Sequence, residues 1–334
     1  RGFGSPQVHF AAECQMDELA KKLDMDPLDL RLKNILRPGT LTATSQPVDD
    51  ACGLEECATR AGEASNWRTK RLEFSGDRGT FRRGIGIALM YHGNSLGPEG
   101  NDYAAVQILI KPDGKVVVRT ALTEYGTGAI SGLAQVAAET LGLPIDQFEL
   151  DRPDTASCQE TGPTVASRVI VIGGRAAQLA AQKLKDKILT VAGDLLNCNP
   201  SRLTIRDGLI RHPDDPGWTV SFEKVVEECH KRHVSLNETG FYIAPKCEFD
   251  PENSQGTTYQ QYTYGAVVAE VEVDTELGVV KPLKITAAYD VGRTINPLSL
   301  EGQIEGGTIQ ALGYGLMEQL IHVDGIVANP TLGD

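Results

Sequence analysis

Two glycine-containing turns in the sequence each run into a segment with helical periodicity. Gly126-Thr127-Gly128 precedes the helical spacing of residues 130–141, and the turn at residues 162–167 precedes that of residues 177–188. A turn that aims successive backbone N–H groups at one point, in front of a helix N-terminus, binds an anion. Ordinary turn glycines have the same spacing, so that alternative stays open.

Three other kinds of site have weaker support in the sequence. Residues 169–177 could form a strand entering a dinucleotide-binding turn, but the G-x-G-x-x-G spacing and the later acidic residue are missing. His230 and His233 could bind zinc, yet further ligands at metal-like spacing are lacking, which favours a solvated helix end. The sequence contains no Walker-type loop.

The cysteine pattern favours reduced thiols over a disulfide framework. The chain has seven cysteines at irregular spacing, and an odd number leaves at least one unpaired. Cys52 and Cys57 are the only close pair, whereas an iron–sulfur cluster needs about four thiolates. We therefore expect a cytoplasmic protein without such a cluster in this chain.

Composition and charge exclude several classes of function. The 334 residues are 41% hydrophobic and 23% charged, which is typical of a soluble globular protein with two or three domains. Basic residues are scattered and the net charge is −13, so we expect no nucleic-acid partner. No apolar run reaches membrane-spanning length, so we expect no membrane partner. The first residue is Arg1 rather than Met, so we expect the natural N-terminus to lie before it.

The first part of the chain is predicted to be mainly helical. Apolar residues recur at three- and four-residue steps over residues 8–23, which is one face of a helix. Asp26-Pro27 then supplies an N-cap and a first-turn proline for a second helix that ends near Leu36. After a loop over residues 39–50, a polar helix is expected from about Leu54 to Arg71.

The next part is predicted to contain a strand and a β-hairpin. Residues 83–92 have the composition of a strand. Strands over residues 106–110 and 116–118 flank Lys111-Pro112-Asp113-Gly114, where proline presets the first turn angle and glycine tolerates positive φ. Further along the chain, residues 220–232 are expected to form a short helix.

The clearest strand pattern lies at residues 267–274. Val267, Ala269, Val271 and Val273 alternate with Val268, Glu270, Glu272 and Asp274. This period of two predicts that the second set faces solvent. A turn at residues 276–278 then leads into a returning strand over residues 279–289.

The last predicted element is a helix over residues 299–319. It contains Gly306, Gly307, Gly313 and Gly315, and glycine destabilises a helix interior. Four such residues indicate a close approach of the backbone to something else. Altogether, the elements predict an α+β fold of mixed sheets and helices in two lobes, with a domain boundary at about residues 72–82.

Several further motifs follow one another in a fixed order. They are Arg1–Gln7, Glu13–Asn34 with Met25-Asp26-Pro27, Tyr125–Gly128, Gly162–Arg168, Tyr264-Gly265, Val271–Asp274, Asp290-Val291-Gly292, Asn296-Pro297 and Gly302–Gly307. Together they resemble the molybdopterin-binding (molybdenum) subunit of the xanthine dehydrogenase and aldehyde oxidase family. The resemblance spans nearly the whole chain. It implies that residues 1–75 are the C-terminal part of a first molybdopterin-binding domain and that residues 81–334 belong to a second one.

The resemblance also implies roles for individual residues. Arg1 would lie beside the molybdenum centre and donate hydrogen bonds, as a planar guanidinium can, and Phe3 would stack on a planar substrate. No residue of this chain is implied as a metal ligand. Core packing for Phe3 and a helix-packing hydrogen bond for Gln303 are the alternatives. The cofactor-binding residues would be Tyr125, Gly126, Thr127, Ala166, Ser167, Arg168 and Gln303.

The implied activity is the oxidative hydroxylation of a purine-like N-heterocycle, with water as the oxygen source. The implied cofactor is molybdenum–molybdopterin, in a mononucleotide or dinucleotide form. Electrons would pass to 2Fe-2S and FAD centres in partner domains or subunits, and the remaining halves of the molybdenum subunit would be further partners. One alternative is an aldehyde oxidoreductase of the same family. A second is a non-catalytic assembly or binding module, and a third is a nicotinamide dehydrogenase.

The sequence departs from the family pattern in two respects. Thr127 stands where the family commonly has glutamine, so the side chain that would contact the cofactor here differs from the family's. The glutamate that acts as general base in such enzymes has no matching motif before Asp334. We therefore expect this chain alone to be inactive.

Overall fold

The computed structural model describes residues 2–331 of the chain, without the side chains of Phe3 and Pro216. Two compact units are present, and each is assembled from segments that are distant in the sequence. Unit 1 consists of Arg1–Thr40, Pro47–His92 and Thr263–Asp334, and unit 2 of Leu41–Gln46 and Gly93–Tyr262. The boundary expected at residues 72–82 lies within unit 1. Helices and mixed sheets occur in the chain, as expected for an α+β fold.

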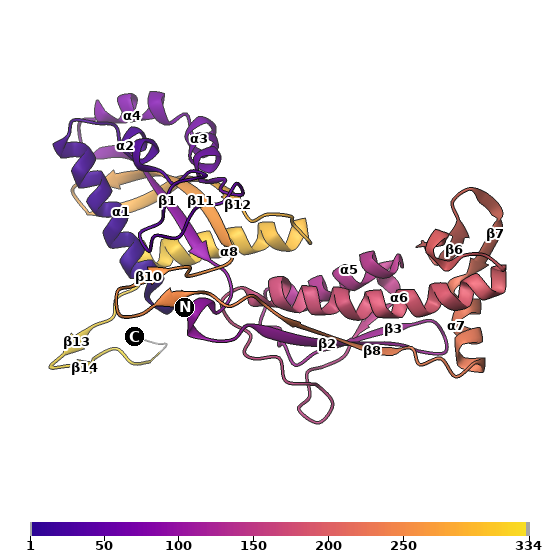
Figure 1. Cartoon of the computed structure of the whole chain (residues 1–334). Helices are drawn as coiled ribbons and strands as arrows, with labels where there is room; N and C mark the ends of the chain where they lie inside the picture. Colours follow the sequence, from indigo (N-terminus) through magenta and orange to yellow (C-terminus); the bar gives the residue numbers. More distant parts are fainter. Residues whose placement is uncertain (1, 332–334) are drawn as a thin grey trace. The chain divides into compact units, whose positions relative to one another are not determined.

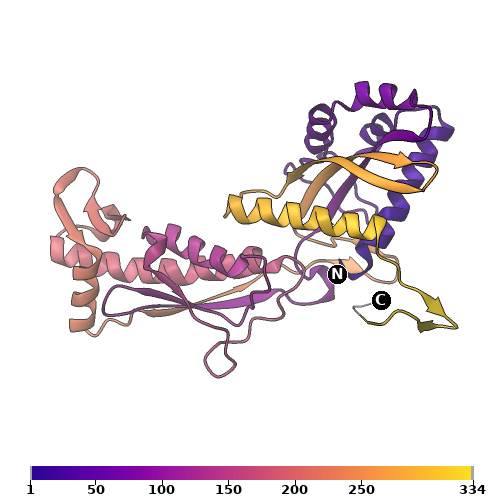
Figure 2. The same ribbon diagram turned by 180° about the vertical axis from the view of Figure 1, so that it is seen from behind.

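Unit 1 is built on a three-stranded sheet with the strand order β1-β11-β12. The hairpin of β11 and β12 is antiparallel and pairs Tyr264 with Asp290 at one end and Asp274 with Val279 at the other. Helix α3 packs on β12, and in both views α8 lies on the other side of the sheet (Figures 1 and 2). The elements of unit 1 are η1 (Gly2–Gly4), α1 (Ser5–Lys22), α2 (Pro27–Asn34), α3 (Leu54–Ala64), α4 (Trp67–Ser75), β1 (Phe81–Gly93), β11 (Tyr262–Asp274), β12 (Val279–Asp290), α8 (Pro297–Leu316), β13 (His322–Val323) and β14 (Ile326–Val327).

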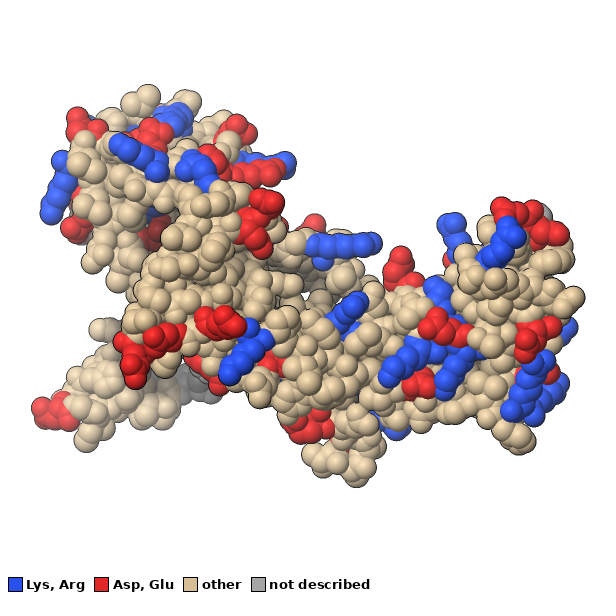
Figure 3. All heavy atoms as spheres, in the orientation of Figure 1, with Lys and Arg blue, Asp and Glu red and all other residues tan. Residues whose placement is uncertain are grey.

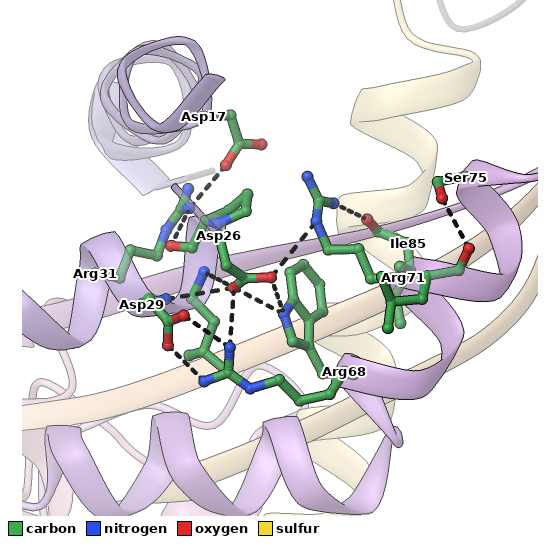
Figure 4. A network of polar contacts seen from close by, with 12 residues as sticks. Asp17, Asp26, Asp29, Arg31, Arg68, Arg71, Ser75 and Ile85 are labelled. Atoms are coloured by element: carbon green, nitrogen blue, oxygen red, sulfur yellow. Dashed lines mark hydrogen bonds and ion pairs between the residues drawn. The ribbon is translucent and has the colours of Figure 1, made fainter. Parts of the chain in front are cut away.

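A polar network around Asp26 fixes the start of α2, as its N-cap position predicts (Figure 4). The Asp26 carboxylate accepts hydrogen bonds from the backbone N–H of Leu28 at 2.8 Å and from the indole N–H of Trp67 at 3.0 Å. Arg68 and Arg71 lie 4.0 Å and 3.7 Å from its oxygens. Because one carboxylate satisfies donors on both α2 and α4, the helices of unit 1 are held together at this point.

One helix expected in unit 1 is divided into two. The polar helix predicted from about Leu54 to Arg71 is interrupted at Asn66, whose φ of 54° is left-handed. Asparagine adopts this conformation more readily than most residues. The change in direction separates α3 from α4 and accompanies the burial of Trp67, which is 1% exposed.

The buried face of β11 differs from the prediction. Val268 and Glu270 were expected to face solvent, but they are 0% and 5% exposed. Lys70 on α4 donates to one oxygen of Glu270 at 2.7 Å, which offsets the cost of burying this carboxylate. A buried carboxylate needs such a partner, and the strand pattern could not reveal one from a distant helix.

Apolar residues of α1 and α8 remain exposed. Val8 and Leu19 on α1 are 72% and 49% exposed, and Ile309 on α8 is 68% exposed. The glycines of α8 were expected to allow a close backbone approach. Among residues 2–331, however, no atom lies within 4 Å of a Cβ built at Gly306 or Gly307.

Unit 2 is built on a four-stranded sheet with the order β4-β3-β2-β8 and a smaller sheet with the order β5-β6-β7. The predicted hairpin of β2 and β3 is antiparallel, and β4 adds to β3 in parallel. The elements of unit 2 are η2 (Gly97–Glu99), β2 (Tyr103–Ile110), β3 (Val116–Arg119), α5 (Ala129–Leu141), η3 (Ile145–Gln147), β4 (Phe148–Leu150), η4 (Val169–Gly173), α6 (Gly174–Leu196), η5 (Pro200–Arg202), β5 (Thr204–Arg206), β6 (Leu209–His212), β7 (Asp215–Ser221), α7 (Phe222–Lys231), β8 (Asn237–Ile243), β9 (Phe249–Asp250) and β10 (Gln255–Gly256).

The core of unit 2 lies between its larger sheet and the neighbouring helices α5 and α6 (Figures 1 and 2). The face of α6 predicted from its spacing is the buried one: Ala177, Ala180, Leu184 and Ile188 are all 0% exposed. Burying a Leu or Ile side chain of this kind contributes roughly 1.5–3 kcal/mol. The core therefore holds the N-terminal ends of α5 and α6, and the loops that precede them, in fixed positions.

The charged side chains, the helix lengths and the cysteines can be described for the same part of the chain. Acidic and basic side chains are interspersed on the face shown in Figure 3. Within residues 2–331, every helix is too short or too polar to cross a membrane. The same residues include all seven cysteines, each of which is a free thiol.

Candidate functional site

The glycine turn before α5 holds an anion that belongs to the chain itself. One oxygen of Glu124 accepts hydrogen bonds from the backbone N–H groups of Gly126 at 2.8 Å, Thr127 at 2.6 Å and Gly128 at 3.1 Å. Its other oxygen accepts from the N–H of Ile130 at 3.2 Å. The turn therefore has the converging donors of an anion site, and a carboxylate occupies it.

The ionisation of Glu124 reflects these donors. Partial burial raises the pKa of this carboxyl, but the N–H groups of Ile130, Gly126, Gly128 and Thr127 outweigh it and bring the pKa down to about 2. A carboxyl with a depressed pKa stabilises the fold above its ordinary value of 4.5, and this contribution is lost as the pH falls toward 2.

Glu124→Gln should accordingly show a pH-dependent loss of stability. At pH 6 we expect the free energy of unfolding to fall by about 1–2 kcal/mol, a value reduced for the exposure of this side chain. Urea denaturation should show that the difference in unfolding free energy between the wild type and the variant is smaller at pH 3 than at pH 6. Glu139→Gln, which removes an exposed carboxylate from helix α5 after the turn, is the matched control. The same difference in unfolding free energy at both pH values would contradict the prediction.

The second turn has donors that remain open. Ala166 and Ser167 adopt left-handed φ values of 50° and 57°, which cost roughly 1–2 kcal/mol for each L-residue. Their backbone N–H groups have no hydrogen-bond partner within residues 2–331, and both residues are exposed. The turn leads into the π-helical segment Val169–Gly173 and then α6, so a helix N-terminus stands behind it. Because the segment is helical, the alternative of a strand entering a dinucleotide-binding turn is wrong.

Arg168 supports this second turn from inside the protein. It is 1% exposed, and its Nη1 donates to the carbonyls of Thr161 at 2.9 Å and Pro163 at 2.8 Å. Its Nη2 donates to the Tyr103 carbonyl, and its Nε to Asp102 at 2.6 Å. Arg168 therefore shapes the loop, which differs from the direct cofactor contact implied by the resemblance.

The two turns are tied together within unit 2. The backbone N–H of Thr123 donates to the Thr164 hydroxyl at 2.8 Å, and the Thr123 hydroxyl lies 3.2 Å from the same oxygen. The N–H of Ser95 donates to the Ala166 carbonyl at 2.6 Å. Two segments about 40 residues apart in the chain thus converge.

The other predicted site residues are placed as follows. Tyr125 is 64% exposed between Glu124 and the glycines of the first turn. Gln303 lies on α8 in unit 1 and is exposed. Arg1 and the side chain of Phe3 lie outside the described residues. The structure therefore brings Tyr125, Gly126, Thr127, Ala166, Ser167 and Arg168 into one region of unit 2.

Sequence reasoning missed Glu124, Asp102 and Thr164. An acidic residue two positions before Gly126 was a usable signal for Glu124, whereas nothing local marks Asp102 as the partner of Arg168. Asp102 also lines a pocket of about 230 Å³ together with Ser95 and Ile172. Within residues 2–331, no three His, Cys, Asp or Glu side chains are grouped so as to bind a metal ion.

The fold and this region define an α+β protein that presents an open anion cradle at a helix N-terminus. The family model of the molybdopterin cofactor-binding domain matches residues 60–334, and a second model of the same description matches residues 1–35. The chain therefore belongs to the molybdopterin cofactor-binding family that includes the molybdenum-binding subunits of xanthine dehydrogenases.

Individual relatives agree with this assignment. The xanthine dehydrogenase molybdenum-binding subunit of Escherichia coli O157:H7 is 30% identical over 342 residues, covering 100% of this chain and 44% of that protein. The aldehyde oxidoreductase of Megalodesulfovibrio gigas is 30% identical over 321 residues, covering 95% of this chain and 32% of that protein. The fold resembles that of quinoline 2-oxidoreductase from Pseudomonas putida 86, with a TM-score of 0.83, 24% identity, and coverage of 98% of this chain and 42% of that one. The chain thus spans less than half the length of these relatives.

Proposed function

We propose that this chain forms part of a molybdenum hydroxylase that oxidatively hydroxylates a purine-like N-heterocycle, with water as the oxygen source. It would act with the rest of the molybdenum subunit and with iron–sulfur and flavin domains or subunits, in the cytoplasm. When bound, the molybdenum–molybdopterin cofactor would supply the redox and Lewis-acid chemistry, and the protein would bind and orient it.

The open turn at Ala166 and Ser167 is the observation that carries this proposal. Its two N–H groups and the helix behind it provide the donors that a phosphate group needs. Left-handed strain in adjacent L-residues persists where the surrounding structure enforces it, often at ligand sites. Here the buried guanidinium of Arg168 provides that enforcement. The residues present therefore fit a phosphate-bearing cofactor.

Each residue of the chain has a separate role in the proposal. Ala166 and Ser167 would bind the cofactor's phosphate through their N–H groups, and Arg168 would hold their loop in shape. Tyr125, Gly126 and Thr127 would contact the pterin through groups other than the N–H donors that Glu124 already uses. Cofactor binding by Gln303, substrate stacking by Phe3 and a catalytic role for Arg1 remain proposals from the resemblance.

Two substitutions of one exposed residue test the phosphate site in the assembled enzyme. Ser167→Asp places a negative charge beside the proposed phosphate, whereas Ser167→Asn has similar size and tolerates the same left-handed φ. Molybdenum measured by elemental analysis, and pterin by fluorescence after oxidation, should fall at least about tenfold in Ser167→Asp. Both should stay near wild-type levels in Ser167→Asn. Equal cofactor content in both variants would contradict the proposed site.

An aldehyde oxidoreductase is the second candidate, because a protein of that name is 30% identical to this chain. Steady-state assays of the assembled enzyme with a purine and with an aldehyde separate the two substrates. A non-catalytic assembly module is the remaining alternative, and it predicts that the purified assembly contains neither molybdenum nor pterin.

A further inference from the structure

The two anion-binding turns of unit 2 differ in one respect: the first is filled and the second is open. Four N–H donors between Gly126 and Ile130 converge on Glu124. Thr127 adds its hydroxyl at 3.1 Å to the same carboxylate. At the second turn, Glu160 accepts from the N–H of Gly162 at 2.6 Å, but the donors of Ala166 and Ser167 are left without a partner within residues 2–331.

A second anion cannot share the first turn with Glu124. Two like charges in contact repel each other even at the effective dielectric constant of a protein surface. The four N–H donors of Gly126, Thr127, Gly128 and Ile130 already bind Glu124, and the N–H of Ala129 donates to the Thr127 hydroxyl at 3.3 Å. An incoming phosphate would therefore meet repulsion at the first turn and unpaired donors at the second.

The filled turn also determines where the open one lies. Thr123, the residue before Glu124, donates its backbone N–H to Thr164 at 2.8 Å. Thr164 lies two residues before Ala166, on the loop that presents the open donors. When Glu124 fixes the first turn, it also fixes the attachment point of the second loop.

We propose that Glu124 is a positioning residue whose carboxylate acts as a permanent internal anion, reserving phosphate binding for the turn at Ala166 and Ser167. This inference rests on the proposed function for the identity of the incoming phosphate. It assigns different tasks to two turns that look equivalent in the sequence. The first is a structural clamp, and the second is the ligand site.

Amide NMR of the isotopically labelled full chain, titrated with inorganic phosphate, tests the inference. In the wild type, the amide signals of Ala166 and Ser167 should shift, and those of Gly126 and Gly128 should not. In Glu124→Ala, the emptied turn should bind phosphate at least about tenfold more tightly than in the wild type, so that Gly126 and Gly128 also shift. Glu139→Ala removes an exposed carboxylate from helix α5, which follows the turn, and should behave as the wild type does.

The outcomes separate the inference from the proposed function. Phosphate-induced shifts at Gly126 and Gly128 in the wild type would overturn the role of Glu124, as would their absence in a folded Glu124→Ala. If circular dichroism shows that Glu124→Ala is unfolded, Glu124→Gln replaces it, because this neutral side chain keeps the size of glutamate. If the amide signals of Ala166 and Ser167 shift in none of the proteins, the proposed phosphate site is wrong. The signals of Gly126 and Gly128 would still test whether Glu124 keeps phosphate out of the first turn.

Discussion

Replacing Arg168 with methionine is expected to lower the free energy of unfolding by about 3–5 kcal/mol. The substitution leaves Asp102, 7% exposed, as a buried charge that has lost its cationic partner at 2.6 Å. It also removes the donors to the carbonyls of Thr161 and Pro163, so the loop that carries Ala166 loses its internal support. Urea denaturation followed by circular dichroism measures the first effect, and molybdenum content of the assembled enzyme the second.

Two comparisons make this expectation specific. Arg202→Met breaks an ion pair with Asp214 in which both side chains are more than half exposed, and it should cost less than about 1 kcal/mol. Combining Arg168→Met with Asp102→Asn should cost less than the sum of the single substitutions, because the two residues interact directly. If Arg168→Met and Arg202→Met lower the free energy of unfolding by similar amounts, the buried ion pair does not support the fold.

Gly240→Ala is expected to destabilise unit 2 by about 3 kcal/mol or more. A Cβ built at Gly240 on β8 lies 1.9 Å from the carbonyl oxygen of Ala176 and 2.7 Å from the backbone nitrogen of Ala180. Both atoms belong to the backbone of α6, which cannot rotate away as a side chain can. The helix must therefore separate from the strand, which disrupts the packing that places the open turn.

A glycine in open space provides the control for Gly240. Gly86 lies in β1, and no atom is within 4 Å of a Cβ built there, so Gly86→Ala should change stability by less than about 1 kcal/mol. Urea denaturation gives the two costs, and hydrogen exchange should show lost protection in β8 and α6 for Gly240→Ala alone. Equal costs for the two substitutions would contradict the close approach seen in the structure.

Local patterns predicted most of the helices and strands. The N-cap at Asp26 and the turn at residues 111–114 depend on interactions between residues that are near in the sequence, and the structure confirms them. The buried face of α6 is also confirmed, because the helical spacing of apolar residues marks the side that packs on the core. The predictions failed where a distant residue intervenes. The buried Glu270 has its charge partner in Lys70, 200 residues away in the sequence. The periodicity of apolar residues shows which side of a helix is apolar. It does not show whether another element covers that side, so the exposure of the apolar residues on α1 and α8 could not be predicted.

The candidate site likewise has features that the local sequence predicts and features that depend on tertiary contacts. The sequence alone determined that two glycine turns precede helices and that their motifs belong to the molybdopterin-binding family, because turn chemistry and motif order are local properties. Only the tertiary structure decided that Glu124 fills one turn, that Asp102 and Arg168 shape the other, and that Thr123 and Thr164 join them. Apart from the contact of Glu124 with its own turn, these contacts link segments about 40 to 66 residues apart. Their existence depends on the packing of α5 and α6 against one sheet, which no local pattern specifies.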